Sequence, residues 1–202
     1  MKRVLTICLL GLPLLAQERA PKNELAFQLG GLAGLSRATS NGKLDLGPGV
    51  ALQSNYGRRF KEWGQAALYG EVHFLASPLR EVSTSTSTAT RDVASLFIAP
   101  GVRVKFAPRR AISPYAATGF GPAWYEQSTM QLNGAPNTAP RETVRAAFNF
   151  GGGVDVRVWR WLAMRGEVRD FYTGSPAYNV SSVRGGQHNV VAGAAFVVRW
   201  RQ

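Results

Sequence analysis

Two histidines are the residues of this 202-residue chain that could activate a nucleophile. A hydroxyl nucleophile needs a serine within reach of a histidine that a third group orients. His73 is separated from Ser77 by three apolar residues, and His188 follows a stretch that holds Ser181 and Ser182. Neither spacing is typical of a catalytic pair, so we expect both histidines to be network or interface residues. The sequence also holds no Cys/His spacing of a metal site, and we expect no metal, no cofactor and no enzyme activity.

Charged residues are the second set that could carry a function, because they recur at alternating positions between apolar ones. Those predicted to share one interior face are Glu71, His73, Arg103, Lys105, Arg145, Asp155, Arg157, Arg165, Glu167, Arg169 and Arg199. A buried charge without a partner costs several kcal/mol, so such a set must pair internally. We therefore expect a stabilising charge network in the interior rather than a conducting path, with Asp155 close to Arg165 across a tight corner.

The segment Thr143–Trp159 shows which kind of element positions these charges. Val144, Phe148, Phe150 and other apolar residues alternate there with arginine, asparagine, aspartate and small residues. Side chains of a strand point to opposite faces with period two. One face of this long strand is thus apolar and the other polar, as expected for a transmembrane strand between lipid and a crowded polar interior.

Seven further segments alternate in the same way. The eight predicted strands are Glu24–Ser36, Leu44–Gly57, Gln65–Ala76, Val93–Phe106, Pro114–Glu126, Thr143–Trp159, Trp161–Tyr172 and His188–Trp200. Their connections alternate between short ones (Arg58–Gly64, Ala107–Ser113 and the Trp159–Trp161 corner) and long polar ones (Ser77–Asp92, Gln127–Glu142 and Thr173–Gln187). Short turns on one rim and long loops on the other predict an all-β, antiparallel, up-and-down transmembrane barrel with its long loops extracellular.

The N-terminal residues predict export. Lys2 and Arg3 precede the apolar run Val4–Leu15, and Ala16 offers a small residue for cleavage. This pattern is typical of a secretory signal peptide, and the run is too short for a membrane-spanning helix. We expect a signal peptide at residues 1–16, a short segment at 17–23 and one barrel domain at 24–202. Cys8 is the only cysteine, and the large residue before it disfavours a lipid anchor.

Aromatic residues gather where the predicted strands meet the short turns. They are Tyr56, Trp63, Phe106, Trp159, Trp161 and Trp200. Rings with one wet and one apolar end favour the boundary between membrane and water. We expect this set to form a membrane-interface girdle on the short-turn rim.

The net charge of +12 and the pI of about 10.7 raise the question of nucleic acid as a partner. The basic residues are spread through strands and turns, and no basic helix, zinc spacing or aromatic stacking motif accompanies them. We therefore expect no nucleic-acid partner.

The order of these features resembles the small OmpA-type eight-stranded outer-membrane barrel proteins. The last strand, HNVVAGAAFVVRW (His188–Trp200), and the stretch FNFGGGVDVRVWRWLAMRGEVRDFY (Phe148–Tyr172) carry the resemblance. It implies the outer membrane of a Gram-negative-type bacterium, outer-membrane lipids as surroundings, and a barrel-insertion machinery that recognises the terminal strand through an aromatic such as Trp200. Arg201 and Gln202 follow that aromatic, which departs from the family's pattern.

The expected function is a non-enzymatic outer-membrane barrel with a structural or surface-interaction role, with minor anion-preferring pore activity left open and no extracellular partner identified. Because lipid A deacylases and acyltransferases share the eight-stranded architecture, a lipid-modifying enzyme of the outer membrane is the first alternative. A soluble periplasmic ligand-binding barrel is the second.

Overall fold

The computed structural model describes residues 21–40, 42–174, 176–180 and 182–201, and all regular elements in these ranges are strands. The strands are β1 (Asn23–Gly34), β2 (Arg37–Thr39), β3 (Gly42–Leu46), β4 (Gly49–Trp63), β5 (Ala66–Thr84), β6 (Asp92–Phe106), β7 (Ile112–Gln127), β8 (Glu142–Arg157), β9 (Leu162–Thr173) and β10 (Gln187–Trp200). In these ranges no helix is long and apolar enough to cross a membrane. The predicted signal peptide lies outside the described residues.

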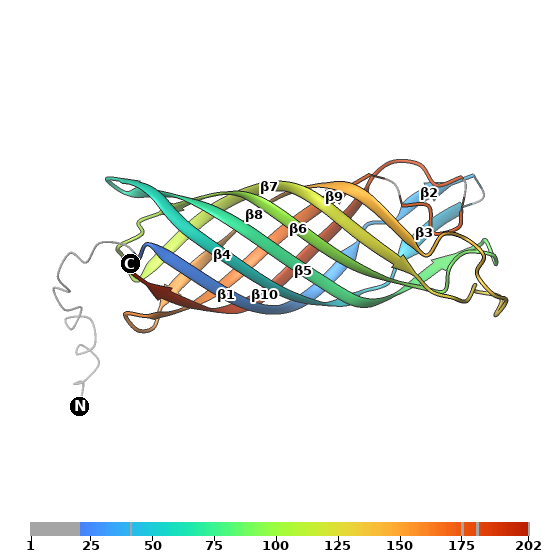
Figure 1. Ribbon diagram of the computed structural model, residues 1–202, viewed down its shortest axis with the longest axis horizontal. Coiled ribbons are helices and arrows are strands. Elements are labelled where there is room, and N and C mark those ends of the chain that lie inside the picture. Colours follow the sequence, from blue (N-terminus) through green and yellow to red (C-terminus); the bar gives the residue numbers. More distant parts are fainter. Residues whose placement is uncertain (1–20, 41, 175, 181, 202) are drawn as a thin grey trace, which may run out of the picture.

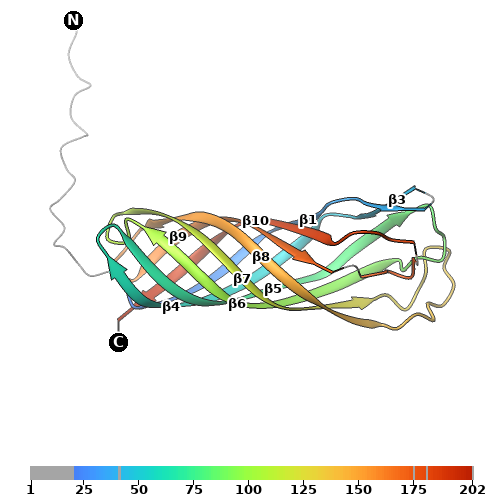
Figure 2. The same ribbon diagram turned by 90° about the horizontal axis from the view of Figure 1, so that it is seen from above.

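Eight of the strands close into an antiparallel ring. Neighbours pair in the order β1, β4, β5, β6, β7, β8, β9 and β10, and β10 pairs with β1 to complete the circle. Figures 1 and 2 show the result as an elongated cylinder of tilted strands, with the end of β10 on the same rim as the short turns. The predicted fold class is thereby confirmed.

Three predicted segments on the β3–β4–β5 side of the barrel are wrong. The segment Leu44–Gly57 falls on two strands, because Gly47 and Pro48 separate β3 from β4. β4 runs on to Trp63, which reduces the turn predicted at Arg58–Gly64 to two residues, with Gly64 at φ +52°. β5 runs on to Thr84 past a register shift, so the loop predicted at Ser77–Asp92 is largely strand.

The added strands extend the barrel at the end opposite the short turns. β2 and β3 form a hairpin, and β3 pairs with the far end of β5 through Leu44 opposite Thr84. The hairpin was not predicted, because strands this short show too few residues for alternation to be read. Figure 1 shows it beside the long connections at the far end of the cylinder.

The outer wall is apolar along its middle. Exposed large hydrophobic residues on the wall include Phe27, Leu29, Leu52, Phe74, Leu96, Val102, Phe120, Phe148, Phe150, Val154, Met164, Val168 and Phe196. Soluble domains bury such residues, whereas a barrel in lipid presents them outward. The alternation in β8 follows this rule, with Phe148 and Phe150 exposed and Asn149 between them fully buried.

Candidate functional site

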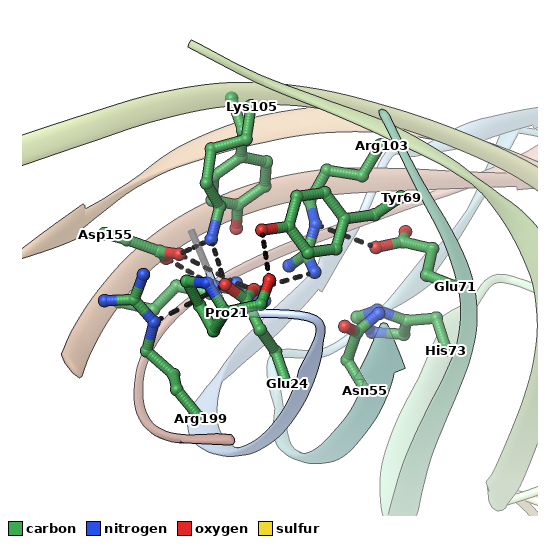
Figure 3. Close-up of polar contacts among 12 residues, drawn as sticks. Pro21, Glu24, Asn55, Tyr69, Glu71, His73, Arg103, Lys105, Asp155 and Arg199 are labelled. Atoms are coloured by element: carbon green, nitrogen blue, oxygen red, sulfur yellow. Dashed lines mark hydrogen bonds and ion pairs between the residues drawn. The ribbon is translucent and has the colours of Figure 1, made fainter. Parts of the chain in front are cut away.

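Glu24 is the centre of a buried charge cluster in the half of the barrel nearest the short turns (Figure 3). Its Oε1 lies 2.5 Å from Lys105 Nζ and 3.5 Å from Arg199 Nε. Its Oε2 lies 3.0 Å from Arg103 Nη2 and 3.3 Å from Arg165 Nη2. One carboxylate from β1 is thus shared by cations from β6, β9 and β10, and it ties together walls that are far apart in the ring.

Asp155 is the second acid of this cluster. β8 and β9 pair with Asp155 opposite Arg165, and the guanidinium donates to both carboxylate oxygens at 2.7 and 3.1 Å. Lys105 Nζ lies 2.6 Å from the same carboxylate. Two-pronged pairing of this kind is among the stronger charge-assisted contacts in proteins.

A second group of charges stacks directly on the first. Arg169 Nη1 donates to Glu71 at 2.8 Å, and Arg169 Nε lies 3.2 Å from Glu167. Tyr115 donates its hydroxyl to Glu167 at 2.5 Å. Arg103 connects the two groups, since its Nε lies 3.6 Å from Glu71 while its Nη2 binds the cluster below.

The two groups together nearly balance in charge. Among the described residues they hold the carboxylates of Glu24, Glu71, Asp155 and Glu167 and the cations of Arg103, Lys105, Arg165, Arg169 and Arg199. Tyrosine rings line the remaining space. Arg103 and Lys105 each lie 5.1 Å from the Tyr69 ring, and Arg165 lies 4.8 Å from the Tyr115 ring. The attraction between these paired charges and the neighbouring rings offsets the cost of removing the charges from water.

Two residues expected in this interior lie at its margins. Arg145 and Arg157 lie on the face of β8 that points into the barrel, as expected, but they stand near opposite ends of that strand. Arg145 is exposed and Arg157 is half-buried. Parity assigns a face of the sheet but not a height along the barrel, and for that reason the sequence placed them with the buried set.

His73 lies in a layer of amides next to the charged groups. Its Nε2 is 2.8 Å from Gln53 Oε1, and its Nδ1 is 3.3 Å from Asn55 Nδ2. The Phe171 ring lies 5.5 Å away on the other side. Because these neighbours are two amides and an aromatic ring, the contacts of His73 are those of a packing residue and not of a catalytic base.

An apolar core fills the barrel above this layer. Phe97 packs against Phe171 at 5.2 Å and against Tyr125 at 5.8 Å between ring centroids. Tyr125 meets Tyr178 at 6.1 Å, and Tyr178 comes from the connection between β9 and β10. Burial raises the pKa of Tyr178 well above its usual value, so this residue stays neutral. A loop residue therefore caps the interior from the far end.

Two arginines lie at the same end of the interior. Arg80 donates to Asn189 Oδ1 at 2.8 Å and to the Gly47 carbonyl at 3.1 Å. Arg37 donates to the Pro176 carbonyl at 2.7 Å. Their positive charge is stabilised by carbonyl and amide oxygens, and the contacts hold β3, β10 and the β9–β10 connection together.

The sequence analysis missed the most connected residue of the interior. Leu25 and Phe27 of β1 point outward. Because side chains alternate between the two faces of a strand, Glu24 must point inward. It was overlooked because it stands at the first position of the predicted strand. Arg80 and Tyr178 left no comparable signal, since they lie in segments predicted to be loops.

His188 lies on the outer side of the barrel rather than in its interior. Its Nδ1 is 2.6 Å from Asp170 Oδ2, and its ring is 4.7 Å from that of Tyr172. In the described part of the chain no serine hydroxyl bonds to it; Ser181 lies outside that part.

The aromatic residues predicted to form a girdle stand at the short-turn end. Trp63, Phe106, Trp159 and Trp161 are exposed beside the turns that join β4 to β5, β6 to β7, and β8 to β9. Trp159 and Trp161 stack at 6.1 Å with 10° between their planes. Tyr56 lies in the middle of β4 rather than at its end, because that strand continues to Trp63, and its ring centroid is 6.4 Å from that of Trp200 at the end of β10.

Comparisons with known proteins agree with this geometry. The family described as "Outer membrane protein beta-barrel domain" matches residues 5–196 of the chain. Neisserial surface protein A is similar in structure, with a TM-score of 0.54 and 12% identity over 91% of this chain and 100% of that one. OprG from Pseudomonas aeruginosa has a TM-score of 0.51 and 11% identity over 92% of this chain and 99% of its own. No curated protein matches the sequence. At these identities the structural likeness shows a shared fold.

Proposed function

The chain belongs to the family of outer membrane protein β-barrel domains of Gram-negative bacteria, and on that premise we propose that it is a closed, non-enzymatic barrel whose extracellular end binds surface partners. One observation carries the proposal. The interior is filled from one end to the other by the paired charges around Glu24, the amide layer at His73 and the aromatic core at Phe97. What such a barrel can offer to a partner is its surface.

The filled interior supports a plug over the pore that the sequence left open. An anion path would need excess positive charge along the barrel, whereas Glu24 brings the buried clusters close to neutrality. A path would also have to cross the packed core around Phe171 and Tyr178, whose side chains are fully buried. Eight-stranded barrels commonly fill their interiors with side chains in this way.

The end opposite the short turns forms a linked platform. Thr90 N donates to the Tyr178 carbonyl at 3.1 Å, and Asn179 Nδ2 donates to the Thr88 carbonyl at 2.6 Å. Arg91 N donates to the Met130 carbonyl at 3.0 Å. Three connections are thus joined to one another, and exposed apolar residues stand on or beside them, among them Leu35, Leu79, Met130 and Leu132. A pre-organised surface with apolar contact area suits protein recognition.

A comparison of three strains tests the proposal. They are the wild type, a strain that lacks the gene for this protein (the deletion), and a strain whose protein has residues 130–138 replaced by a glycine–serine linker (the linker variant). We expect the deletion and the linker variant to change cell-surface adhesion or aggregation in the same direction, because the deletion removes the platform and the linker removes its β7–β8 part with Met130 and Leu132. Uptake of small solutes should stay unchanged in both. The folded barrel of the linker variant is checked by its heat-modifiable migration on gels. A deletion that alters solute uptake and leaves adhesion unchanged would contradict the proposal.

A lipid-modifying enzyme is the second candidate, and the contact between His188 and Asp170 favours it. A histidine oriented by a carboxylate on the outer wall is two-thirds of a hydrolase triad. Mass spectrometry of lipid A from wild-type and His188→Ala strains decides between the two, since a non-enzymatic barrel leaves the acyl pattern identical. The soluble periplasmic barrel considered from the sequence is wrong, because the chain belongs to an outer-membrane family and carries an apolar outer wall.

Cysteine labelling tests the proposed orientation. Ser87→Cys and Thr138→Cys, both at exposed positions of the long connections, should react with an impermeant thiol reagent on intact cells. Arg110→Cys, in the short connection between β6 and β7, should react only after the cells are opened. Labelling of Arg110→Cys alone on intact cells would reverse the orientation.

A further inference from the structure

A basic groove lies at the seam where β1 meets its two neighbours on the short-turn rim. Lys22, Asn23, Tyr56, Arg58 and Trp200 line a space of about 190 Å³. The register explains this gathering, because Asn23 on β1 stands opposite both Trp200 on β10 and Arg58 on β4. Three strands therefore contribute to one recess.

The groove is held in shape by its own hydrogen bonds. Lys22 N donates to the Trp200 carbonyl at 3.2 Å, and Arg59 N donates to the Lys22 carbonyl at 2.7 Å. Tyr56 donates its hydroxyl to Asn23 Oδ1 at 3.0 Å, and the Asn23 side chain is more than nine-tenths buried. The position of Lys22 is thus fixed by backbone contacts to both neighbouring strands.

The two cations of the groove carry charge that the described residues do not neutralise. Neither Lys22 nor Arg58 forms an ion pair or a side-chain hydrogen bond with another described residue. This differs from Arg59 and Arg109 nearby, which both contact Glu62. Arg58 is exposed and Lys22 is half-buried. A pair of cations in a recess attracts an anion, and a phosphate group satisfies an ammonium and a guanidinium at once.

The wall directly above the groove is apolar. On the outer face the next row along the seam holds Val198, Leu25 and Tyr56, and the row after it begins with Phe196 and Phe27. Phe27 and Phe196 are about three-fifths exposed, at 57% and 61%. An anion seated in the groove is therefore joined to a surface that suits acyl chains, with Trp200 and Tyr56 at the boundary.

We propose that this groove binds the phosphate of an anionic glycerophospholipid of the periplasmic leaflet, with its acyl chains along the seam of β10, β1 and β4. The proposal rests on the proposed orientation of the barrel, which the cysteine labelling tests separately. The occupant is a lipid rather than a free phosphate, because the apolar rows at Leu25 and Phe27 continue directly from the cations. Nucleic acid and soluble anions would leave those rows without a partner.

Native mass spectrometry tests the proposal on barrels purified from outer membranes and held in an uncharged detergent. Dioleoyl phosphatidylglycerol is titrated against wild type and against Lys22→Gln/Arg58→Gln. Each cation near a lipid surface contributes about fivefold to the affinity for an anionic lipid, so the double variant should bind about 25-fold more weakly. Dioleoyl phosphatidylcholine should bind wild type more weakly than phosphatidylglycerol does.

Lys61→Gln/Arg110→Gln is the matched control, because it removes the same charge from exposed positions of the same rim outside the groove. It should keep the wild-type affinity. Equal losses in both double variants would reduce the effect to general charge and overturn the proposal. So would equal binding of the two lipids, or binding of glycerol 3-phosphate as strong as that of the lipid.

Discussion

Replacing Glu24 by alanine is expected to lower the free energy of unfolding by about 3–5 kcal/mol, the largest single effect predicted for the interior. The carboxylate is shared by Lys105, Arg103, Arg165 and Arg199, and all four are buried. Its loss leaves Lys105 with Asp155 alone and places uncompensated positive charge between the walls. Urea titration of the barrel refolded in lipid vesicles, followed by tryptophan fluorescence, measures the change.

Glu126→Ala is the control for this experiment. Glu126 pairs with Arg141 at the exposed end of the barrel, where an ion pair contributes about 0–1 kcal/mol. A Glu24→Ala barrel as stable as the Glu126→Ala barrel would mean that the interior is wet, and the account of a dry, closed cluster would be wrong.

Phe196→Arg is expected to destabilise the folded barrel by about 2–4 kcal/mol, because the charge would lie on the lipid-facing wall of β10. Phe196 is 61% exposed and stands opposite Phe27 of β1 and Met164 of β9, in the middle of the outer apolar surface. The same titration in vesicles measures the effect, and the fraction of barrel that inserts gives an independent readout.

Val144→Arg provides the comparison, since Val144 is also exposed on the outer wall but lies near the far end of β8. The cost of a charge falls to about 0–1 kcal/mol near the membrane boundary. If the two variants lost equal stability, depth in the membrane would not be the cause, and the assignment of the lipid-facing wall would fail.

The fold could be predicted because strand alternation is a local signal. The alternation of apolar and polar residues shows which face each side chain takes, as at Phe148, Asn149 and Phe150. Eight such segments with alternating connection lengths predict a barrel. The level of a side chain along the barrel axis and its partner on the opposite wall could not be predicted in this way. Glu24 and Lys105 are far apart in the chain, and their contact depends on strand tilt and register, which no local pattern encodes.

The end opposite the short turns could not be predicted for a second reason. The β2–β3 hairpin and the connection that carries Tyr178 are short or aperiodic, so neither alternation nor turn residues indicate that they pack. Their positions follow from tertiary contacts such as Arg37 with the Pro176 carbonyl. The hairpin was therefore not predicted, and the connection that carries Tyr178 was predicted only as a long polar loop, whereas in the structure both belong to a linked end of the barrel.

Current recording across a planar lipid bilayer tests the central claim most directly, namely that the interior is closed. The purified wild-type barrel is inserted at neutral pH and held at voltages of both signs. The charge cluster around Glu24 and the core around Phe97 predict no steady conductance, with rare small openings at most. Large, steady currents of either ion selectivity would contradict the account.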